Sequence, residues 1–297
     1  MNMIRRLIVA ALLATALPAR AEPARTAVIS AFAPEMEALR AAATDRREVR
    51  IKGVTFVTGR LEGRPVVLFL SGVSMVNAAM TTQLALDRFK VRRIVFSGVG
   101  GGADPELDVG DVVAPERWAE YQETVYARET PQGFVIPAFG RDSGLPAFGM
   151  MKPRPITVAS PTGETEQKLW FEADPALLAL ARSTTPGVEL ARCAASACLS
   201  RSPRVVVGGA GVSGPTFVDN AAFRQYAHET FGARVLDMET ASVAHVAYAN
   251  GTPFIAFRSL SDLAGGDPAG NQFATFIRLA ADNSARVVKA FVRALPD

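Results

Sequence analysis

Residues 233–262 read ARVLDMETASVAHVAYANGTPFIAFRSLSD: a strand-like run, a helical stretch and a second strand-like run in direct succession. The first run ends in residues 237–239 (Asp-Met-Glu), and the second ends in residues 258–262 (Arg-Ser-Leu-Ser-Asp). Strands that end in carboxylates suggest a site at the carboxyl edge of a sheet, where open α/β folds bind ligands. Carboxylates there can carry out acid–base chemistry or hold hydroxyl groups, although Asp and Glu also cap helices.

The same alternation of strand and helix extends outward over most of the chain. Short apolar, β-branched runs lie between amphipathic helical patterns, which is typical of an α/β protein whose central sheet is covered by helices on both faces. The predicted strands are Thr26–Ala31, Val54–Thr58, Pro65–Ser71, Arg93–Ser97, Asp111–Ala114, Arg204–Val207, Ala233–Leu236 and Pro253–Phe257. The predicted helices are Glu35–Ala42, Val76–Phe89, Pro175–Arg182, Asn220–Phe231, Glu239–Asn250 and Phe273–Leu295.

Residues 117–202 interrupt this rhythm. They hold many Pro, Gly and charged residues around one predicted helix, and we interpret them as a long insertion over the core. The chain has no low-complexity linker and no internal repeat, and about 275 residues are enough for one large α/β domain. We therefore expect a single domain over residues 22–297, with an insertion at about 117–202.

The N-terminus has the composition of a secretory signal peptide. Arg5 and Arg6 precede the apolar run Leu7–Pro18, and residues 19–21 (Ala-Arg-Ala) fit a small-x-small cleavage site. The apolar run spans about a dozen residues, fewer than the ~20 that a transmembrane helix needs. We expect cleavage after Ala21 and a mature protein that is periplasmic or secreted and not held in a membrane.

Removal of this peptide changes the charge balance. Residues 1–21 contain three of the 32 Lys and Arg side chains and none of the 29 Asp and Glu side chains, which leaves 29 of each in the mature chain. The alkaline isoelectric point of the whole chain therefore belongs to the leader. A net charge of zero gives no reason to expect nucleic acid or an anionic surface as a partner.

Cys193 and Cys198 are the only cysteines, five positions apart. In an oxidising compartment a local disulfide is favoured over two free thiols, and its short span limits the entropic stabilisation. The chain has two histidines and no paired Cys–His spacing that would suggest a structural zinc site. We therefore expect no metal ion.

A glycine-rich run at residues 98–103 (Gly-Val-Gly-Gly-Gly-Ala) follows one predicted strand. It matches the dinucleotide fingerprint with Ala at the last position, but that fingerprint must open a helix whose N-terminus holds the pyrophosphate. Residues 104–110 (DPELDVG) form a poor helix, and a strand follows at once. We therefore expect no nucleotide cofactor, and we interpret the run as a close-packed turn that lets the backbone approach a small ligand.

Six motifs add a family resemblance. They are residues 28–40 (VISAFAPEMEALR), 71–79 (SGVSMVNAA), 97–102 with 109–113 (SGVGGG and VGDVV), 212–218 (VSGPTFV), 237–245 (DMETASVAH) and 258–262 (RSLSD). In this order and spacing they resemble the nucleoside phosphorylase/nucleosidase superfamily, and within it the 5′-methylthioadenosine/S-adenosylhomocysteine nucleosidases. The resemblance covers about residues 26–116 and 205–295 and leaves the insertion uncovered. It implies a three-layer fold in which helices flank both faces of a central mixed, twisted sheet.

The resemblance also implies catalytic roles for three acids. Asp262 would protonate N7 of a purine base and make the base a better leaving group. Glu239 would hold the ribose hydroxyls and offset the positive charge that grows on the sugar. Glu35 would orient and deprotonate the attacking water. No cofactor is implied.

Other motif positions are implied to bind the substrate or to support the acids. Phe217 would stack on the base, Val218 would place backbone groups at its edge, and Met238 would pack on the sugar. Arg258 and Ser261 would hold the neighbouring carboxylates in place.

Elementary chemistry agrees with this division of roles. An oxocarbenium-like transition state needs an acid at the leaving group and negative charge near the sugar. One carboxyl must be protonated while another is ionised at the same pH, which requires different surroundings. Asp262 follows an apolar strand in a loop rich in Ser and Gly, where we expect a raised pKa. Taken singly, each acid could equally be a helix cap or a surface charge.

The nucleophile decides between hydrolysis and phosphorolysis. A phosphorylase needs cationic and hydroxyl groups around a bound oxyanion, and the related phosphorylases have an Arg before the glycine-rich turn, a Ser within it and another Arg in the first loop. This chain has Phe96, Val99 and Glu35 at those positions. We therefore expect water as the nucleophile. Val99 also replaces a Ser that is usual in the intracellular nucleosidases, which removes a polar contact near the water.

Two alternatives stay open: a phosphate-dependent purine nucleoside phosphorylase, and a secreted nucleoside-binding or storage protein on the same fold. Retention of Glu35, Glu239 and Asp262 together favours an enzyme, because a binding protein needs neither the acid nor the water base. The sequence does not fix the natural nucleoside, since the insertion could reshape the substituent end of the site. By family analogy, the helices at 76–89 and 273–295 suggest a homodimer.

Overall fold

The structure is a computed structural model that describes residues 23–140, 143–194, 197–267 and 269–296. The predicted signal peptide, residues 1–21, lies outside the described residues. The helices are α1 (Ala33–Ala42), α2 (Met75–Arg88), α3 (Pro175–Thr184), α4 (Ala221–Phe231), α5 (Thr240–Ala249) and α6 (Phe273–Ala294), with a short 3-10 helix η1 (Ala138–Gly140). The strands are β1 (Arg25–Ser30), β2 (Thr44–Ile51), β3 (Val54–Leu61), β4 (Arg64–Leu70), β5 (Val91–Gly102), β6 (Val112–Ala114), β7 (Arg117–Glu120), β8 (Thr124–Tyr126), β9 (Arg128–Thr130), β10 (Gly133–Val135), β11 (Met151–Pro153), β12 (Ile156–Ala159), β13 (Thr165–Lys168), β14 (Phe171–Glu172), β15 (Cys193–Ala194), β16 (Ala197–Cys198), β17 (Val205–Val207), β18 (Ala210–Ser213), β19 (Ala233–Asp237) and β20 (Phe254–Asp262).

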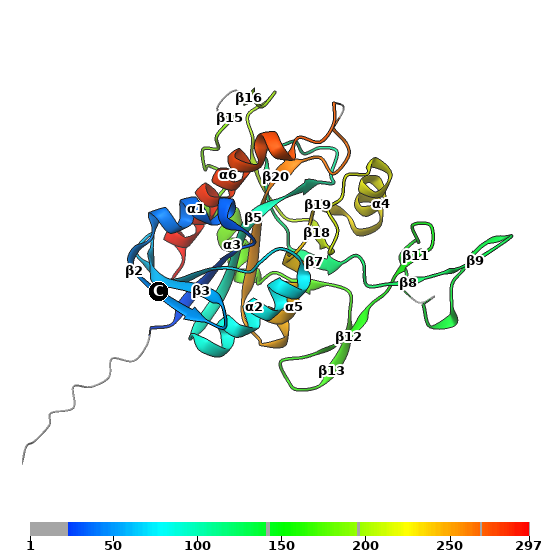
Figure 1. Ribbon diagram of the computed structural model, residues 1–297, viewed down its shortest axis with the longest axis horizontal. Helices are drawn as coiled ribbons and strands as arrows, with labels where there is room; N and C mark the ends of the chain where they lie inside the picture. The colour runs from blue at the N-terminus through cyan, green and yellow to red at the C-terminus, as the bar shows by residue number, and fades with distance from the viewer. Residues whose placement is uncertain (1–22, 141–142, 195–196, 268, 297) are drawn as a thin grey trace, which may run out of the picture.

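Twelve strands of the described chain form one mixed sheet (Figure 1). Its main path runs β14-β7-β18-β19-β5-β1-β4-β3-β2, and β20, β6 and β17 join it because β20 pairs with β5 and β6 pairs with both β20 and β17. The central strand β5 is parallel to β1 and β20 and antiparallel to β19. The expected central mixed sheet is confirmed.

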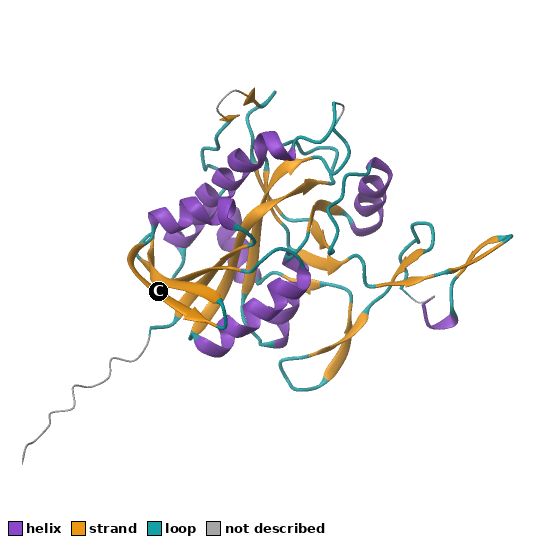
Figure 2. Cartoon of the chain, in the orientation of Figure 1, coloured by secondary structure: helices purple, strands orange, loops and turns teal. Residues whose placement is uncertain are grey.

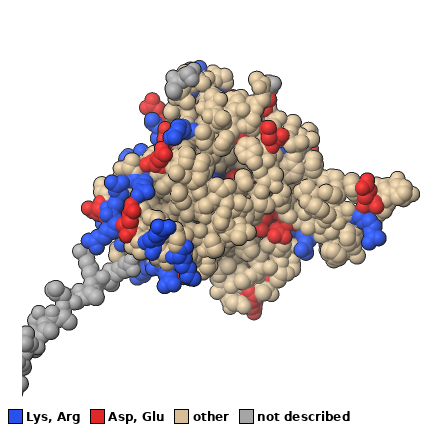
Figure 3. Space-filling model, viewed as in Figure 1, with Lys and Arg blue, Asp and Glu red and all other residues tan. Residues whose placement is uncertain are grey.

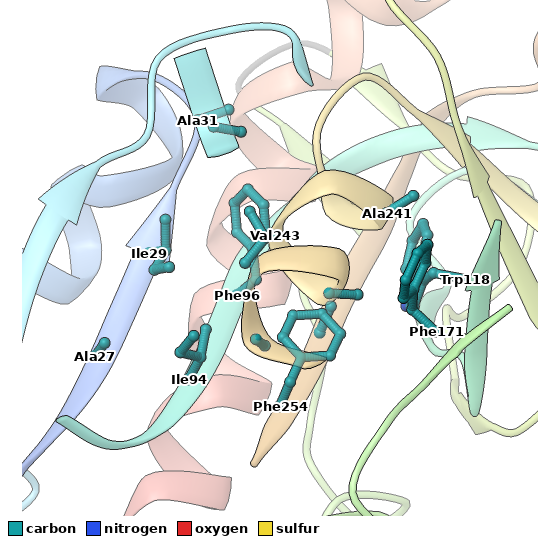
Figure 4. Close-up of a cluster of buried hydrophobic side chains, with 14 of the residues drawn as sticks. Ala27, Ile29, Ala31, Ile94, Phe96, Trp118, Phe171, Ala241, Val243 and Phe254 are labelled. Carbon is teal, nitrogen blue, oxygen red and sulfur yellow. The ribbon is translucent and has the colours of Figure 1, made fainter. Parts of the chain in front are cut away.

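Helices cover both faces of this sheet (Figure 2). α2 packs against α5, while α1 and α3 pack against α6. Alternate residues of β5 face the two layers: Ile94 and Phe96 join the core that contains α5, and Val95 joins the core that contains α6. Figure 4 shows Ile94, Phe96 and Phe254 of the sheet beside Val243 of α5. Because both faces are buried, these strands have the uninterrupted apolar runs from which they were predicted.

The glycine-rich run at residues 98–102 is not a turn. It continues β5, which is extended over the whole of residues 91–102 and pairs with residues 258–262 of β20. A Cβ atom at Gly100 would lie 2.7 Å from the carbonyl oxygen of Leu236. The predicted turn is therefore wrong and the expected close packing is present, because glycine is required here for the approach of neighbouring strands and not for a positive φ.

The sequence pattern misses four strands of the sheet: β2 and β18, and also β7 and β14 within residues 117–202. β2 lies at the edge beside β3 and is exposed over nearly its whole length, so it lacks the apolar alternation that marks a half-buried strand. It carries Arg46, Arg47 and Arg50, and Figure 3 shows basic side chains gathered on this side of the molecule. β18 is the short sequence Ala-Gly-Val-Ser, whose small residues give little strand signal although all four are buried.

Residues 117–202 contribute both to the core and to the surface. β7 and β14 extend the main sheet, and their residues Trp118 and Phe171 are buried in its core. The two-stranded ribbons β8–β11 and β9–β10 extend from the body as an arm (Figure 1), and β12–β13 forms another ribbon. Part of the predicted insertion thus belongs to the sheet itself. That the remainder is an insertion relative to the family stays a prediction, as do the limits 22–297 of the single domain.

Cys193 and Cys198 form a disulfide that joins β15 to β16, so the predicted pairing is confirmed. β15 contacts α6, and the bond therefore closes a small hairpin against the last helix. Within the ranges described above, no helix combines the length and the apolar character needed to cross a bilayer.

Candidate active site

A cavity of about 250 Å3 opens where the carboxyl-terminal parts of β1, β5, β19 and β20 come together. A space of this size suits a small ligand. Its walls come from segments far apart in the sequence: residues 31–35, 73, 99–101, 216–218, 236–239, 261–264 and 273.

The cavity exists because β5 changes neighbours along its length. β1 pairs with β5 as far as Phe96, and β19 pairs with it only at Gly101 and Gly102. Between these stretches one side of β5 has no strand beside it, and a crevice of this kind is where open α/β sheets bind ligands. Since β19 is antiparallel and β20 parallel to β5, the two acid-bearing strand ends approach the cavity from opposite directions. The expectation that they share one carboxyl edge is wrong, although both reach the same site.

Glu35 lies in the first turn of α1 and is buried. Its Oε2 accepts a hydrogen bond from the N–H of Ala31 (2.6 Å), and its Oε1 accepts one from the N–H of Val99 (2.8 Å). Burial raises the pKa of the Glu35 carboxyl, against the opposing effect of Arg258 and these backbone donors. A carboxyl group with a raised pKa is suited to take a proton near neutral pH.

Arg258 is fully buried behind the cavity and is shared by three carboxylates. Its Nε lies 2.7 Å from Asp237 Oδ2, its Nη1 lies 3.5 Å from Glu35 Oε1, and its Nη2 lies 3.4 Å from Glu239 Oε2. The guanidinium is stacked over the ring of Phe96, 4.1 Å from the ring centroid. This position suits the supporting role that the resemblance implies for Arg258.

Glu239 lies between β19 and α5, at the N-cap of α5, and lines the cavity. Its Oε1 accepts a hydrogen bond from the N–H of Ser74 (2.9 Å), which lies at the start of α2. Burial raises the pKa of Glu239 to about 7; Arg258 lowers it, and the charges of Asp237 and Glu35 add to the rise. Near neutral pH this carboxyl therefore exchanges its proton easily.

Asp262 is the last residue of β20 and does not lie in a loop as predicted, because β20 stays paired with β5 as far as Gly101. Its Oδ2 accepts from the hydroxyl of Ser261 (2.9 Å) and its Oδ1 from the N–H of Ala264 (2.9 Å). Burial raises the pKa of the Asp262 carboxyl, and these two hydrogen bonds oppose the rise. The expected rise of its pKa is thus present, and a carboxyl that keeps its proton can act as an acid.

The remaining walls of the cavity are apolar. Phe217, Val218 and Met238 line it, and the Phe217 side chain is half-exposed at 51 %. The ring of Phe217 meets that of Phe273 edge to face, with centroids 5.5 Å apart. Val73, which is 45 % exposed, also lines the cavity, so its apolar surface continues to the outside.

The described lining of the cavity contains negative side chains and no Arg, Lys or His. The acids are Glu35, Asp237, Glu239 and Asp262. Arg258 is occupied by these acids, Phe96 lies beneath its guanidinium, and Val99 packs in an apolar cluster with residues of α6. A phosphate ion would therefore meet carboxylates in place of the cations that it needs.

Eight of the nine site residues predicted from the sequence line this cavity, and Arg258 lies directly behind it. The eight are Glu35, Val99, Phe217, Val218, Met238, Glu239, Ser261 and Asp262. The prediction missed Asp237, although this acid stands beside Glu239 in the same motif, and it missed Ser74, which acts through its backbone. Phe32 and Phe273 were also missed, since neither carries a local signal of a site.

Comparison with known proteins agrees with this geometry. The profile of the phosphorylase superfamily matches residues 25–293. The chain is 30 % identical over 270 residues to the 5′-methylthioadenosine/S-adenosylhomocysteine nucleosidase of Mycobacterium bovis, covering 91 % of this chain and 96 % of that protein. It is similar to the solved structure of the nucleosidase of that name from Colwellia psychrerythraea in complex with adenine, with 27 % identity, a TM-score of 0.69, and coverage of 92 % and 96 % of the two chains. The corresponding structure from Neisseria meningitidis, in complex with methylthio-immucillin-A, gives 27 % identity, a TM-score of 0.67, and coverage of 91 % and 99 %.

Proposed function

This chain belongs to the phosphorylase superfamily, and on that premise we propose that it hydrolyses the N-glycosidic bond of a purine nucleoside of the methylthioadenosine/S-adenosylhomocysteine type. The products are the free base and the free sugar. One observation carries the proposal: buried acids in different surroundings meet at a cavity whose described lining offers no cation. The reaction needs no cofactor.

Asp262 acts as the general acid. Burial raises the pKa of this carboxyl and so favours its protonated form, and it donates this proton to N7 of the purine as the bond between N9 and C1′ breaks. The hydroxyl of Ser261 and the N–H of Ala264 then hold the carboxylate that forms. Phe217 and Val218 bind the base beside it.

Glu239 and Glu35 act on the sugar side. Glu239, when ionised, accepts hydrogen bonds from the ribose hydroxyls and stabilises the oxocarbenium-like transition state, while Met238 packs on the sugar. Glu35 takes a proton from the water that attacks C1′. The proton lost by Asp262 is matched by the one that Glu35 gains, so one water is consumed in each turnover.

The charge of the site favours water over phosphate as the nucleophile. Phosphorolysis would bring an anion toward four acids, with Arg258 already engaged by three of them. Water carries no such penalty. Base release that requires phosphate would show phosphorolysis, and binding without base release would show a binding protein.

We also propose that the mature protein is exported and forms a homodimer. The basic N-terminus and apolar run of the leader support export. α2 supports dimer formation, because its apolar side chains Val76 and Met80 are 79 % and 62 % exposed, whereas α6 is largely buried in the core of its own chain. Val76→Asp should then convert a dimer to a monomer, measured by light scattering coupled to size-exclusion chromatography.

The function is tested with the mature protein, residues 22–297, and three nucleosides: methylthioadenosine, adenosine and inosine. Free base is followed by chromatography, with and without inorganic phosphate. Release that does not depend on phosphate supports the hydrolase, and release that requires phosphate identifies a phosphorylase. Saturable binding by calorimetry without any release identifies a binding protein and overturns the proposal.

A further inference from the structure

One acid of the cavity has no part in the mechanism proposed above. Asp237 ends β19, and its Oδ1 accepts from the N–H of Glu239 (3.3 Å), from the N–H of Thr240 (3.2 Å) and from the hydroxyl of Ser213. Its Oδ2 accepts from the hydroxyl of Thr240 and lies 2.7 Å from Arg258 Nε. Both oxygens are thus engaged by protein groups, so Asp237 has no acceptor left for a substrate hydroxyl.

We propose that Asp237 is a positioning residue: it lies against the Nε edge of Arg258, competes with Glu239 for this one cation and so sets the proton occupancy of Glu239. The inference rests on the proposed function only in its kinetic consequence, because the proton on Glu239 affects turnover only if this carboxyl binds a nucleoside. The arrangement of Asp237, Arg258 and Glu239 exists whether or not a nucleoside is the substrate.

Each nitrogen of the Arg258 guanidinium faces a different acid. Nε of Arg258 lies 2.7 Å from Asp237 Oδ2 and donates to the hydroxyl oxygen of Thr240 (2.9 Å). The two terminal nitrogens of Arg258 point toward Glu35 and Glu239, at 3.5 Å and 3.4 Å. Nη1 also donates to the carbonyl oxygen of Val99 (3.2 Å), which fixes the plane of the fork. The single buried cation of this group is therefore shared, and Asp237 competes for it with Glu35 and Glu239.

The acids around Arg258 outnumber its single positive charge. One guanidinium faces three carboxylates in a buried site, and like charges this close cannot all stay ionised without a large penalty. Asp237 has four hydrogen-bond donors besides Arg258, whereas Glu239 receives one backbone N–H, that of Ser74. Glu239 is thus held by fewer hydrogen-bond donors than Asp237, and burial raises its pKa.

The groups that face Glu239 are few, so the effect of Asp237 has a definite direction. β20 contributes Arg258, β19 contributes Asp237, α1 contributes Glu35, and the start of α2 contributes the N–H of Ser74. Burial raises the pKa of Glu239, and the charge of Asp237 raises it further. Removal of that charge leaves more of the Arg258 field for Glu239 and should lower its pKa.

Asp237→Asn tests the proposal by two readouts. The pH profile of kcat/KM should move its acid limb down by about half to one pH unit, because Glu239 stays ionised to lower pH. The second readout is the pH titration of the Glu239 carboxyl by 13C NMR of protein labelled at glutamate, assigned with Glu239→Gln. Because Glu35 and Glu239 interact, the kinetic limb belongs to the pair, whereas NMR reports Glu239 itself.

A merely structural role predicts the opposite direction. If Asp237 only keeps Arg258 in place, its loss withdraws the cation from Glu239, and the pKa of Glu239 then rises or activity falls equally at every pH. Either result, or an unmoved titration, overturns the proposal. Should Asp237→Asn fail to fold, Asp237→Ser removes the same charge and keeps an oxygen that can accept the N–H groups at the start of α5.

Asp111→Asn is the matched control, because Asp111 is another buried carboxylate held by arginine, outside the cavity. It should leave the titration of Glu239 unchanged. The NMR arm also separates this proposal from the proposed function. If the wild-type protein releases no base from any nucleoside, the function fails, and the titrations of the wild type and Asp237→Asn still decide the role of Asp237.

Discussion

Two clusters of ionisable side chains in this protein differ in their balance of acids and arginines. The surface cluster is Asp108, Asp111, Arg201 and Arg204, and the site cluster is Glu35, Asp237, Glu239 and Arg258. In the surface cluster two acids meet two arginines, and Asp111 lies 2.6 Å from Arg201 Nη2. In the site cluster three acids share one arginine, and all four side chains are buried.

The difference in charge balance has a physical consequence. The arginines of the surface cluster are 38 % and 54 % exposed and keep part of their hydration, so this cluster can join β6 to the segment after β16 at little cost. The site cluster is buried with an excess of negative charge, and burial raises the pKa of Glu35 and raises that of Glu239 to about 7. A cluster with equal numbers of acids and arginines stabilises the fold. A buried cluster with more acids than arginines has raised pKa values, which suit proton transfer in catalysis.

The largest expected effect is on kcat, and it depends on whether the replaced acid lines the cavity and not on how deeply the acid is buried. Asp262→Asn should lower kcat for nucleoside hydrolysis by about 10²–10⁴-fold, because an amide cannot protonate the leaving base. Asp111→Asn replaces a carboxylate that is even more deeply buried, yet kcat should stay within about twofold, since the change lies outside the cavity. Steady-state release of free base measures both. Activity retained in Asp262→Asn would contradict the assignment of the acid.

A second test concerns the room that the buried arginine needs. A Cβ atom at Gly98 would overlap the guanidinium of Arg258 and lie 2.6 Å from Glu35 Oε1. Gly98→Ala should therefore destabilise the protein by about 1–3 kcal/mol or more and reduce activity. Gly187→Ala is the control, because a Cβ there meets nothing within 4 Å, and it should stay within about 0.5 kcal/mol. Urea unfolding measures both, and equal stability of the two variants would refute the tight packing.

The site could be predicted because its acids lie in short motifs with recognisable order, whereas its architecture could not. Residues 98–102 contain four glycines, a composition that locally favours a turn. They form a strand because β20 and β19 approach from either side and leave no room for side chains, which is a tertiary effect. The extension of β20 to Asp262 has the same origin.

Other parts of the structure lay beyond sequence reasoning for different reasons. All six helices are where periodicity predicted them, within a few residues. β2 was not predicted because an exposed edge strand has no buried face and so no alternation of apolar and polar residues. The contact of Ser74 with Glu239 joins positions 165 residues apart and uses a backbone N–H that any residue other than proline would supply, so no side-chain pattern reports it.

The pH dependence of activity should distinguish the acids of the site cluster from those of the surface cluster. Glu239 must be ionised to hold the ribose hydroxyls, and its pKa is raised to about 7; kcat/KM should therefore fall about tenfold per pH unit below that value. On the alkaline side activity should fall as Asp262 loses its proton. Asp111→Asn should show the same acid limb as the wild type. An acid limb below pH 5 in the wild type would mean that the buried acids titrate like exposed ones.

The smallest expected effect is on thermal stability: replacement of Glu239, a residue of the active site, should stabilise the protein. The pKa of Glu239 is raised in the folded state, so its contribution to stability is complete below the ordinary glutamate pKa and is lost as the pH rises through about 7. Glu239→Gln removes the buried charge and should raise Tm at pH 8 by about 2–4 °C. This gain should vanish toward pH 5, where the wild-type carboxyl is itself protonated. Asp111→Asn should lower Tm at pH 8, since it leaves Arg201 and Arg204 without their buried partner. Calorimetry at the two pH values measures these differences, and a loss of stability in both variants would mean that the site cluster serves the fold in the same way as the surface cluster.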